Sequence, residues 1–247
     1  MSCLGSAKRD VRKLLHGFGI DLVRYSADRF PNLRRLKVIR ERGVTVIVDG
    51  GANVGQWSRR LREDGYLGRI VSFEPLELAF TELVHMAALD DLWECHRLAL
   101  GDSNGQAPIS VAANSWSSSL LPMESRHLES APESAYICEE TVTTTRLDSL
   151  MNSVFAPNDR LFVKLDVQGF ELQALRGSDR LLNQVEALEL ELSLVPLYTG
   201  QALLPDLVAY AHAKGFHLVN LEPGFADPRN GQLLQANGLF VRNLQAY

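Results

Sequence analysis

The sequence has 247 residues, of which 46% are hydrophobic, so it can bury the core of one domain with small additions. Its formal net charge is -5 and its basic residues are dispersed, which argues against a nucleic-acid partner. No apolar run approaches the roughly 20 residues needed to cross a bilayer, and the N-terminus carries charges where a signal peptide has an apolar core, so we expect a cytoplasmic protein without a membrane span.

We expect residues 1–43 to form a helical extension ahead of a main domain at residues 44–247. Within the extension, residues 8–18 predict a helix that packs on the edge of the domain or covers its substrate side. The apolar residues that set this helical spacing are Val11, Leu14, Leu15 and Phe18.

After residue 43, strand and helix patterns alternate, which favours an α/β fold with a mostly parallel sheet and helices on both faces. The predicted strands are residues 44–49, 69–74, 94–99, 160–166, 186–194, 216–221 and 238–242. The predicted helices are residues 56–64, 77–89, 168–176 and 203–214.

One long insertion interrupts this alternation. Residues 107–113 and 137–147 predict an added pair of strands. The stretch between them, residues 114–136, is rich in Ser, Glu and Pro and contains Trp116. Long loops in compact domains are usually lids or disordered segments, so both a substrate-gating lid and a solvated linker stay open.

A glycine-rich turn ends the first strand. Residues 44–55, VTVIVDGGANVG, lead from this strand into a helix, and a small-molecule cofactor usually binds at such a junction. The spacing is not the dinucleotide GxGxxG, and the carboxylate of Asp49 would repel a pyrophosphate. S-adenosylmethionine carries an ammonium and a sulfonium but no phosphate. We therefore expect Asp49 to receive the ammonium, while Gly51, Asn53 and Gly55 let the backbone approach closely.

Two further strand ends supply candidate cofactor residues. Glu74 follows Gly55 by 19 positions, close to the spacing at which an acid meets ribose hydroxyls, and we favour this role over that of a solvated acid. After the third strand, Leu100 could face an adenine ring and Asp102 its amino group. The turn GDSNG explains the same residues without a ligand, so both interpretations stay open.

The candidate catalytic residues are acids on the fourth and fifth strands. In LFVKLDVQGFE, Lys164 and Asp166 share one strand face. They could simply neutralise one another, but we favour Asp166 as the group that orients a substrate hydroxyl or takes its proton. Glu191, in EALELELSL, is a second candidate, although a partly solvated strand would explain it too. The two acids could hold a divalent metal through oxygen ligands, but they are far from a full coordination set.

These motifs occur together in a specific order. They are DGGANVG, FEP at residues 73–75, ALGD at 99–102, TRLDSL at 145–150 and KLDVQGFE at 164–171. On these motifs the sequence resembles the FkbM family of S-adenosylmethionine-dependent methyltransferases over residues 44–243. The resemblance implies the class I methyltransferase fold, a Rossmann-like sheet of seven strands with helices on both faces. It also implies O-methylation of sugars, polyketides and other secondary metabolites, which is what most members do.

The resemblance also implies roles for individual residues. It implies that the turn residues from Asp49 to Gly55 contact the methionine part of the cofactor and that Glu74 contacts the ribose. The region of Leu100 and Asp102 would contact the adenine. Asp166 would lie near the transferable methyl group. The family shares no universal catalytic base, and related sugar O-methyltransferases often need magnesium, so the base and the metal stay open.

The function that we expect is methyl transfer to a saccharide hydroxyl of a glycolipid or polysaccharide precursor. Methylation of a polyketide or another small metabolite is the first alternative. A nicotinamide-dependent oxidoreductase would share the sheet and the ribose acid but lacks its glycine motif, and a non-catalytic cofactor-binding protein is the remaining alternative. The sequence does not indicate an oligomeric state.

Overall fold

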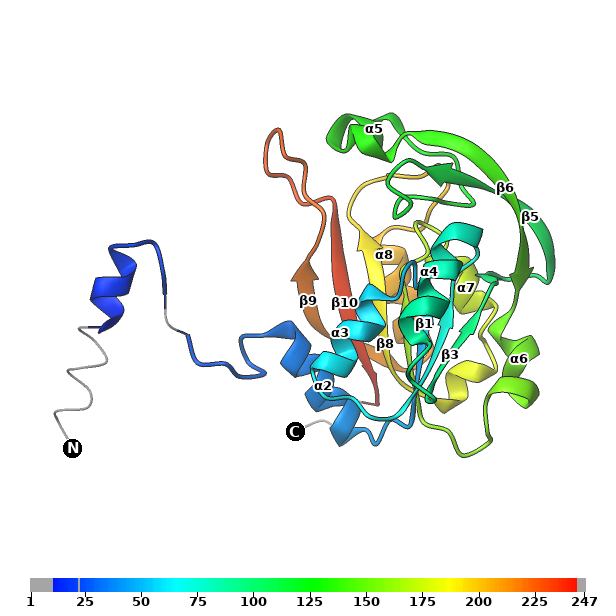
Figure 1. The fold of residues 1–247 in the computed structure, drawn as a ribbon, viewed down its shortest axis with the longest axis horizontal. Helices are drawn as coiled ribbons and strands as arrows, with labels where there is room; N and C mark the ends of the chain where they lie inside the picture. Colours follow the sequence, from blue (N-terminus) through cyan, green and yellow to red (C-terminus); the bar gives the residue numbers. More distant parts are fainter. Residues whose placement is uncertain (1–10, 22, 244–247) are drawn as a thin grey trace.

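The computed structural model describes residues 11–21 and 23–243, and its centre is a seven-stranded sheet flanked by helices (Figure 1). The strand order is β3-β2-β1-β7-β8-β10-β9. Strand β10 is antiparallel to both of its neighbours, and the other pairs are parallel. This confirms the predicted Rossmann-like α/β fold. The strands are β1 Val46–Gly50, β2 Arg69–Phe73, β3 Trp93–His96, β7 Leu161–Leu165, β8 Val185–Ser193, β9 Phe216–Pro223 and β10 Gln235–Arg242.

The central strands of this sheet are buried on both faces. Every residue of β1 and of β7 is buried, as expected for the near-continuous apolar runs of a parallel sheet covered on both sides. In the register of the sheet, Asp49 of β1 lies beside Ser72 of β2 and Lys164 of β7. The carboxyl ends of these strands therefore meet at one edge, where side chains distant in sequence are brought together.

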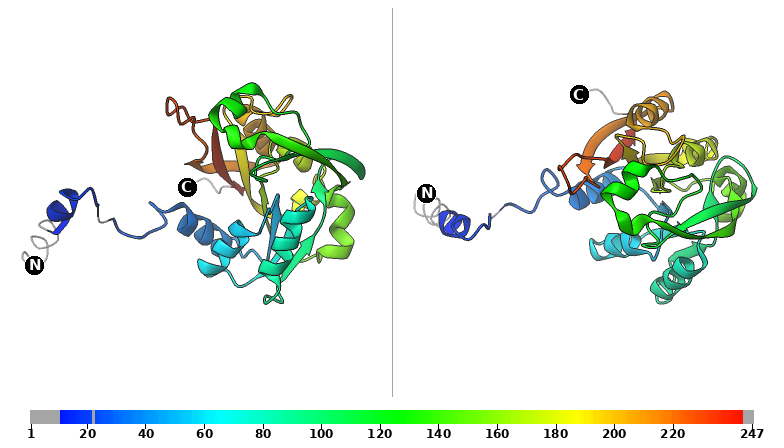
Figure 2. Two further views of the ribbon diagram at one scale, coloured as in Figure 1. Left: turned by 45° about the horizontal axis from the view of Figure 1, so that its top comes forward. Right: turned by 90° about the horizontal axis from the view of Figure 1, so that it is seen from above.

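Helices cover both faces of the sheet, and Figure 2 shows α3 and α4 on one side and α8 on the other. Three helices contribute buried residues to the core on one face: α2 Pro31–Glu41, α3 Gln56–Glu63 and α4 Glu77–Ala87. Three contribute to the core on the other face: α6 Leu147–Val154, α7 Glu171–Arg176 and α8 Leu204–Ala213. Helices α2 and α6 were not expected from the sequence. In the described part of the chain, none of the helices is long and apolar enough to cross a membrane.

A second sheet of three strands lies beside the first, in the order β4-β6-β5. It consists of β4 Ala99–Leu100, β5 Gly105–Ala112 and β6 Tyr136–Thr145. The antiparallel pairing of β5 with β6 confirms the predicted added strand pair. The expected third strand of the main sheet, residues 94–99, was wrong at its end. β3 stops at His96, and the chain then joins the second sheet through β4, which pairs with β6.

The stretch between β5 and β6 is folded. It contains α5 Ser125–Ser130 and the short 3-10 helix η1 Pro132–Ser134 (Figure 1). A bridge joins Ser110 to Ser119, and another joins Met123 to Tyr198. These contacts hold the segment against the second sheet and the loop after β8, so it is not the solvated linker that the sequence left open.

The N-terminal segment departs from the prediction. Residues 8–10 of the expected helix lie outside the described residues, and residues 11–16 are helical. This helix extends away from the sheet (Figure 1), and Leu14 and Phe18 are 66% and 76% exposed. The expectation that it packs on the domain or covers a substrate is therefore wrong. Helix α2 packs on the sheet instead, and the domain boundary at residue 43 stays a prediction.

Candidate active site

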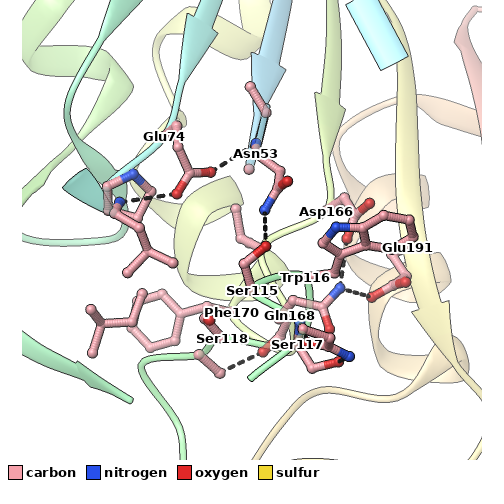
Figure 3. Close-up of a pocket in the computed structure, with 18 of the residues that line it drawn as sticks. Asn53, Glu74, Ser115, Trp116, Ser117, Ser118, Asp166, Gln168, Phe170 and Glu191 are labelled. Carbon is pink, nitrogen blue, oxygen red and sulfur yellow. Dashed lines mark hydrogen bonds between the residues drawn. The ribbon is translucent and has the colours of Figure 1, made fainter. Parts of the chain in front are cut away.

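A cavity of about 550 Å³ lies at the carboxyl edge of β1, β2, β7 and β8 (Figure 3). Its roof is formed by residues 114–120, here called the roof segment, together with parts of α5 and η1. Figure 3 shows Glu74 and Asn53 at one end of the cavity and Asp166, Gln168 and Glu191 at the other. The predicted site residues that line it are Gly51, Asn53, Glu74, Leu100, Asp166 and Glu191. Asp49, Gly55 and Asp102 are not among the lining residues.

The glycine turn brings three strand ends into contact. Gly51 has a φ of +70°, and a Cβ atom there would lie 1.9 Å from the backbone oxygen of Asp166, so only glycine fits. Asn53 has a φ of 48°, and its backbone N–H donates to Glu74 Oε2 at 2.8 Å. Gly55, with a φ of +86°, precedes α3 and packs against α4 and β3. The residue therefore serves the packing of the turn, and its contact with the cofactor stays a prediction.

Asp49 lies beneath the cavity and is fully buried. Its carboxylate is 3.1 Å from Lys164 Nζ and accepts a hydrogen bond from Ser58 Oγ at 2.7 Å. Lys164 also lies 3.7 Å from Asp166 Oδ2 and donates to the backbone oxygen of Gly51 at 3.0 Å. Burial alone would lower the pKa of Lys164, but Asp49 and Asp166 raise it, so the amine stays charged. Asp49 is therefore enclosed and already paired, and its direct contact with the ammonium of a ligand stays a prediction.

Glu74 has the geometry expected of a ribose-binding acid. It is buried, and it accepts hydrogen bonds from the backbone N–H groups of Leu76 at 3.0 Å and Asn53 at 2.8 Å. Burial raises the pKa of Glu74 to about 7. Each carboxylate oxygen can accept a second hydrogen bond, so the side chain can receive a pair of hydroxyl groups from the cavity.

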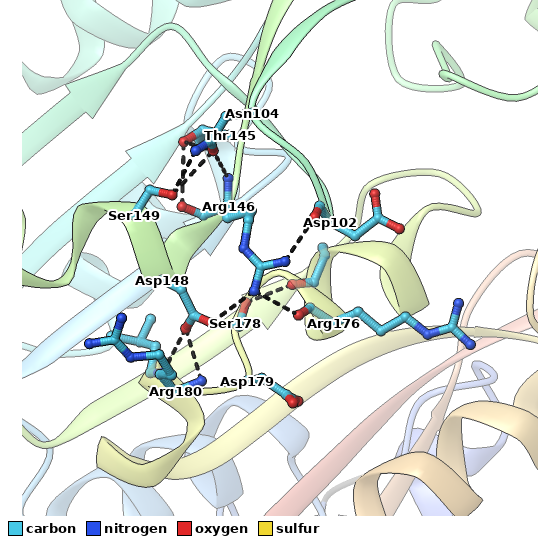
Figure 4. A network of polar contacts seen from close by, with 12 residues as sticks. Asp102, Asn104, Thr145, Arg146, Asp148, Ser149, Arg176, Ser178, Asp179 and Arg180 are labelled. Carbon is cyan, nitrogen blue, oxygen red and sulfur yellow. Dashed lines mark hydrogen bonds and ion pairs between the residues drawn. The ribbon is translucent and has the colours of Figure 1, made fainter.

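Apolar side chains line the cavity around Leu100. Leu76, Ile109 and Phe170 contribute to this wall, which suits the faces of a flat ring. Asp102 lies outside the wall in an exposed turn, where its backbone oxygen accepts a hydrogen bond from an arginine at 2.9 Å (Figure 4). The turn interpretation of GDSNG therefore accounts for this residue, and its hydrogen bond to an adenine amino group stays a prediction.

The TRLDSL motif belongs to the structural network of Figure 4. Asp148 is buried, and its Oδ1 accepts hydrogen bonds from the backbone N–H groups of Arg180 and Leu181, each at 2.9 Å. Its other carboxylate oxygen lies 3.1 Å from Arg146 Nη2, and Arg146 is also the arginine that holds the turn at Asp102. These hydrogen bonds hold α6 against the start of η2 Leu181–Gln184, and the motif lies outside the cavity.

The two predicted catalytic acids are brought together by an amide. Gln168 Nε2 donates to Asp166 Oδ1 at 2.8 Å and to Glu191 Oε2 at 3.0 Å. Gln235 Nε2 donates to the same oxygen of Glu191 at 2.7 Å. Enclosure by the protein, and then the charge of Asp166, raise the pKa of Glu191 well above its ordinary value, which favours its neutral form. The Asp166 side chain is 36% exposed and is the acid open to the cavity.

The roof segment is bonded to the floor of the cavity. Asn53 Nδ2 donates to Ser115 Oγ at 3.2 Å, and Ser119 Oγ donates to the backbone oxygen of Gln168 at 2.7 Å. Trp116 lines the cavity with 66% of its surface exposed. The segment therefore closes the site as a lid would, with one aromatic side chain at its rim.

The structure also brings in residues that sequence reasoning did not select. Gln168, Gln235 and Lys164 all line the cavity, and only Lys164 had a sequence signal, its place beside Asp166 in the strand. His127 of α5 also lines the cavity. Burial lowers the pKa of His127 to about 4, so the ring is neutral at physiological pH.

The donor set does not fit a metal ion. Among the residues that the structure describes, no group of three or more His, Cys, Asp or Glu side chains is placed to hold one. The acids Asp166 and Glu191 meet amide N–H groups, which cannot act as ligands. Whether the reaction needs magnesium is thus a question for experiment.

Comparison with known proteins decides the family. The family model described as the methyltransferase FkbM domain matches residues 49–218, from the end of β1 into β9. The chain belongs to the FkbM family of S-adenosylmethionine-dependent methyltransferases. This confirms the resemblance drawn from the motifs and favours methyl transfer over nicotinamide chemistry. The methyltransferase sdnD of Sordaria araneosa is 27% identical over an alignment of 195 residues, and the match covers 70% of this chain and 73% of that protein.

Solved methyltransferase structures are similar to this FkbM protein at low sequence identity. Magnesium protoporphyrin IX methyltransferase (ChlM) from Synechocystis PCC 6803, with bound SAM, has 12% identity and a TM-score of 0.44, covering 96% of this chain and 97% of that chain. The 1,6-didemethyltoxoflavin-N1-methyltransferase of Burkholderia thailandensis has 12% identity and a TM-score of 0.42, covering 98% and 89%. Similarity at this level says nothing about the acceptor of this chain.

Proposed function

We propose that this FkbM protein transfers a methyl group from S-adenosylmethionine to a hydroxyl of a saccharide, in a glycolipid or polysaccharide precursor, in the cytoplasm. The observation that carries the proposal is the placement of Asp166. Its carboxylate faces the cavity, with one oxygen fixed by Gln168 Nε2 at 2.8 Å and the other 3.7 Å from Lys164 Nζ. A fixed carboxylate in a lidded cavity is the group needed to receive the proton of a hydroxyl nucleophile.

The residues of the other half of the cavity fit the methyl donor. Glu74 suits the two ribose hydroxyls, because its carboxylate is buried and has acceptor capacity left. The apolar wall around Leu100 and Phe170 suits the adenine ring. The turn at Gly51 presents backbone groups to the methionine part. When bound, S-adenosylmethionine would supply an electrophilic methyl group on a positively charged sulfur.

The protein's own work is then to orient the acceptor and to hold its proton. Asp166 would accept the hydroxyl proton on one of its carboxylate oxygens while the hydroxyl oxygen of the acceptor becomes nucleophilic. Glu191, in its neutral form, would leave Asp166 as the one charged acid of the pair and can donate a hydrogen bond to the acceptor. The roof segment would keep water from competing with the acceptor, so positioning is the main source of rate.

The character of the roof favours a saccharide. The hydroxyl side chains of Ser115, Ser117 and Ser118 line the cavity on this side, and Trp116 presents an aromatic face at the rim. Hydroxyl groups suit the polar edges of a sugar and an indole suits its apolar face. A polyketide hydroxyl would need fewer of these polar groups and stands as the alternative.

A screen of acceptors tests the proposal. Sugar and polyketide acceptors are incubated with labelled S-adenosylmethionine, with magnesium and with a chelator, and the position of the methyl group is found by NMR. We expect an O-methylated sugar. A product methylated on nitrogen or carbon, or turnover restricted to acceptors without a sugar, would contradict the proposal.

The role of Asp166 is tested by Asp166→Asn. We expect turnover to fall by roughly 100-fold, because the amide cannot take the proton. Affinity for S-adenosylhomocysteine, measured by calorimetry, should stay within about twofold, since the ribose and adenine subsites are untouched. Asp102→Asn is the matched control, because Asp102 is exposed and is not a lining residue of the cavity. Turnover equal to that of the wild type in Asp166→Asn would end the proposed role of Asp166.

A further inference from the structure

Gln168 occupies an unusual backbone conformation in the wall of the cavity. Its φ is 53°, in the left-handed region that residues other than glycine rarely adopt, and Gly169 follows with a φ of 92°. Such strain persists only where the surroundings hold it in place, and it often occurs at functional sites. The conformation turns the side chain of Gln168 toward the two acids, as Figure 3 shows.

A buried tyrosine fixes the direction of the Gln168 amide. The hydroxyl of Tyr198 donates to Gln168 Oε1 at 2.7 Å, and Tyr198 is fully buried in the loop after β8. Because the amide oxygen is held in this way, the amide nitrogen must face the acids, where it donates one N–H to Asp166 and the other to Glu191. All the hydrogen-bonding groups of the side chain are thereby engaged.

The same residue is held by the roof segment. Ser119 Oγ donates to the backbone oxygen of Gln168 at 2.7 Å. The hydroxyl of Tyr198 also lies 3.1 Å from the backbone oxygen of Ser117. Gln168 is therefore bonded through its backbone to the roof segment, through its amide oxygen to a residue that touches the roof segment, and through its amide nitrogen to both acids.

We propose that Gln168 is a positioning residue that couples seating of the roof segment to the orientation of Asp166 and Glu191. This inference rests on the proposed function, in which these acids face the acceptor hydroxyl. With the roof segment seated, the amide is fixed and both acids are held. When Ser119 moves away, the backbone of Gln168 loses the donor that holds it, and the two acids lose the fixed position of their common donor.

The chemistry of the position favours a neutral donor. Besides Asp166 and Glu191 themselves, the charged or titratable groups that face the pair are Lys164 on β7, Glu171 on α7 and Tyr198 in the loop after β8. A carboxylate at position 168 would add another negative charge to this group. An apolar side chain would leave Asp166 Oδ1 without its amide donor and Glu191 Oε2 with only that of Gln235. Only an amide of this length supplies two N–H groups and no charge.

The hydrogen bonds can be tested on the protein without any acceptor. In the 1H–15N spectrum of glutamine side chains, the Gln168 signal is the one that disappears in Gln168→Met. We expect both of its amide protons to be shifted from the free-amide position and to exchange slowly with water. Tyr198→Phe should return them toward the free position. A wild-type signal at the position of a free, rapidly exchanging amide would overturn the inference.

The coupling to the roof segment has a matched pair of variants. Ser119→Ala removes the hydroxyl that bonds the backbone of Gln168, and it should raise exchange of the Gln168 amide protons by about tenfold or more. Ser118→Ala removes a neighbouring hydroxyl that instead accepts from the backbone of Ala112, and it should leave the exchange unchanged. Equal exchange rates in both variants would overturn the coupling.

Catalysis supplies a further readout, with the sugar acceptor found in the screen. Asparagine fits the left-handed backbone, but its shorter side chain cannot span the two acids. For Gln168→Asn we therefore expect a fold like that of the wild type and a kcat that is lower by about tenfold or more. Affinity for S-adenosylhomocysteine should be retained, and Gln173→Met on α7, outside the cavity, should behave as the wild type. An unchanged kcat in Gln168→Asn would overturn the inference. Failure of the proposed function would look different: no O-methylation by the wild type, with the amide signature intact.

Discussion

The backbone N–H of Asn53 donates a hydrogen bond to Glu74 Oε2 across 2.8 Å, so the turn after β1 and the end of β2 form one unit. The contact holds a buried carboxylate at the cavity whose pKa burial raises to about 7. A group that titrates there reports on whatever binds beside it, because a ligand that donates hydrogen bonds favours the charged form.

Binding of the methyl donor should therefore be linked to a proton. If ribose hydroxyls donate to Glu74, they stabilise its ionised form, so binding near pH 7 releases a proton from Glu74 and affinity rises from pH 6 to pH 8. Calorimetry of S-adenosylhomocysteine in buffers of different ionisation enthalpy measures this release. In Glu74→Gln we expect the release to vanish and the affinity to fall by about tenfold or more. Proton release that persists in Glu74→Gln would contradict the assignment.

Asp49 should prove to be a stability residue. In Asp49→Ala the buried amine of Lys164 loses its nearest partner, so the free energy of unfolding at pH 7 should fall by about 3 kcal/mol or more in chemical denaturation. The double variant Asp49→Leu with Lys164→Met removes both charges and should recover part of this loss. A large fall in affinity for S-adenosylhomocysteine with unchanged stability would instead indicate direct contact with the cofactor.

Trp116 should act on the acceptor and leave the donor unaffected. Its ring is 66% exposed at the rim of the cavity, where it can cover one face of a sugar. In Trp116→Ala we expect the KM for the saccharide to rise by about tenfold, since stacking of this kind contributes on the order of 1 kcal/mol or more. Trp116→Phe should retain part of the affinity. An acceptor KM that does not change in Trp116→Ala would remove this contact from the proposal.

Substitution of Asp148 should lower stability, whereas substitution of Asp102 should change neither stability nor cofactor binding. Asp148→Ala removes the acceptor of two backbone N–H groups and the partner of Arg146, and should lower the melting temperature by about 5 °C. Asp102→Ala should change neither the melting temperature nor the affinity for S-adenosylhomocysteine, because its side chain is exposed and takes no part in the cavity. Weaker cofactor binding in Asp102→Ala would restore the adenine role first expected for it.

Sequence reasoning found the part of the site that local rules define. Gly51, Glu74 and Asp166 each follow a strand directly, Asn53 lies in the turn after β1, and parallel strands place their carboxyl ends at one edge. Their meeting in one cavity therefore follows from correct strand assignment alone. The glycine turn carries its own signal as well, because the close approach at Gly51 excludes any side chain.

Other features depended on contacts between distant segments. Asp49 pairs with Lys164 because β1 and β7 are neighbours in the sheet, although these two facing positions are 115 residues apart in the sequence (164 less 49). The exposed N-terminal helix shows the converse, since its apolar spacing predicts burial but nothing in the described structure packs on Leu14 or Phe18.

The sequence by itself determined the family, the sheet and the strand-end residues that line the cavity, because periodicity and turn chemistry are local properties of the chain. Only the tertiary structure decided which acids reach the cavity and how they are held. Asp49 is enclosed by its ion pair, whereas Asp166 and Glu191 share the amide of Gln168, whose direction is fixed by Tyr198. The physical reason is that burial and hydrogen-bond partners are set by neighbours across the fold, and these set the charge and orientation of each acid.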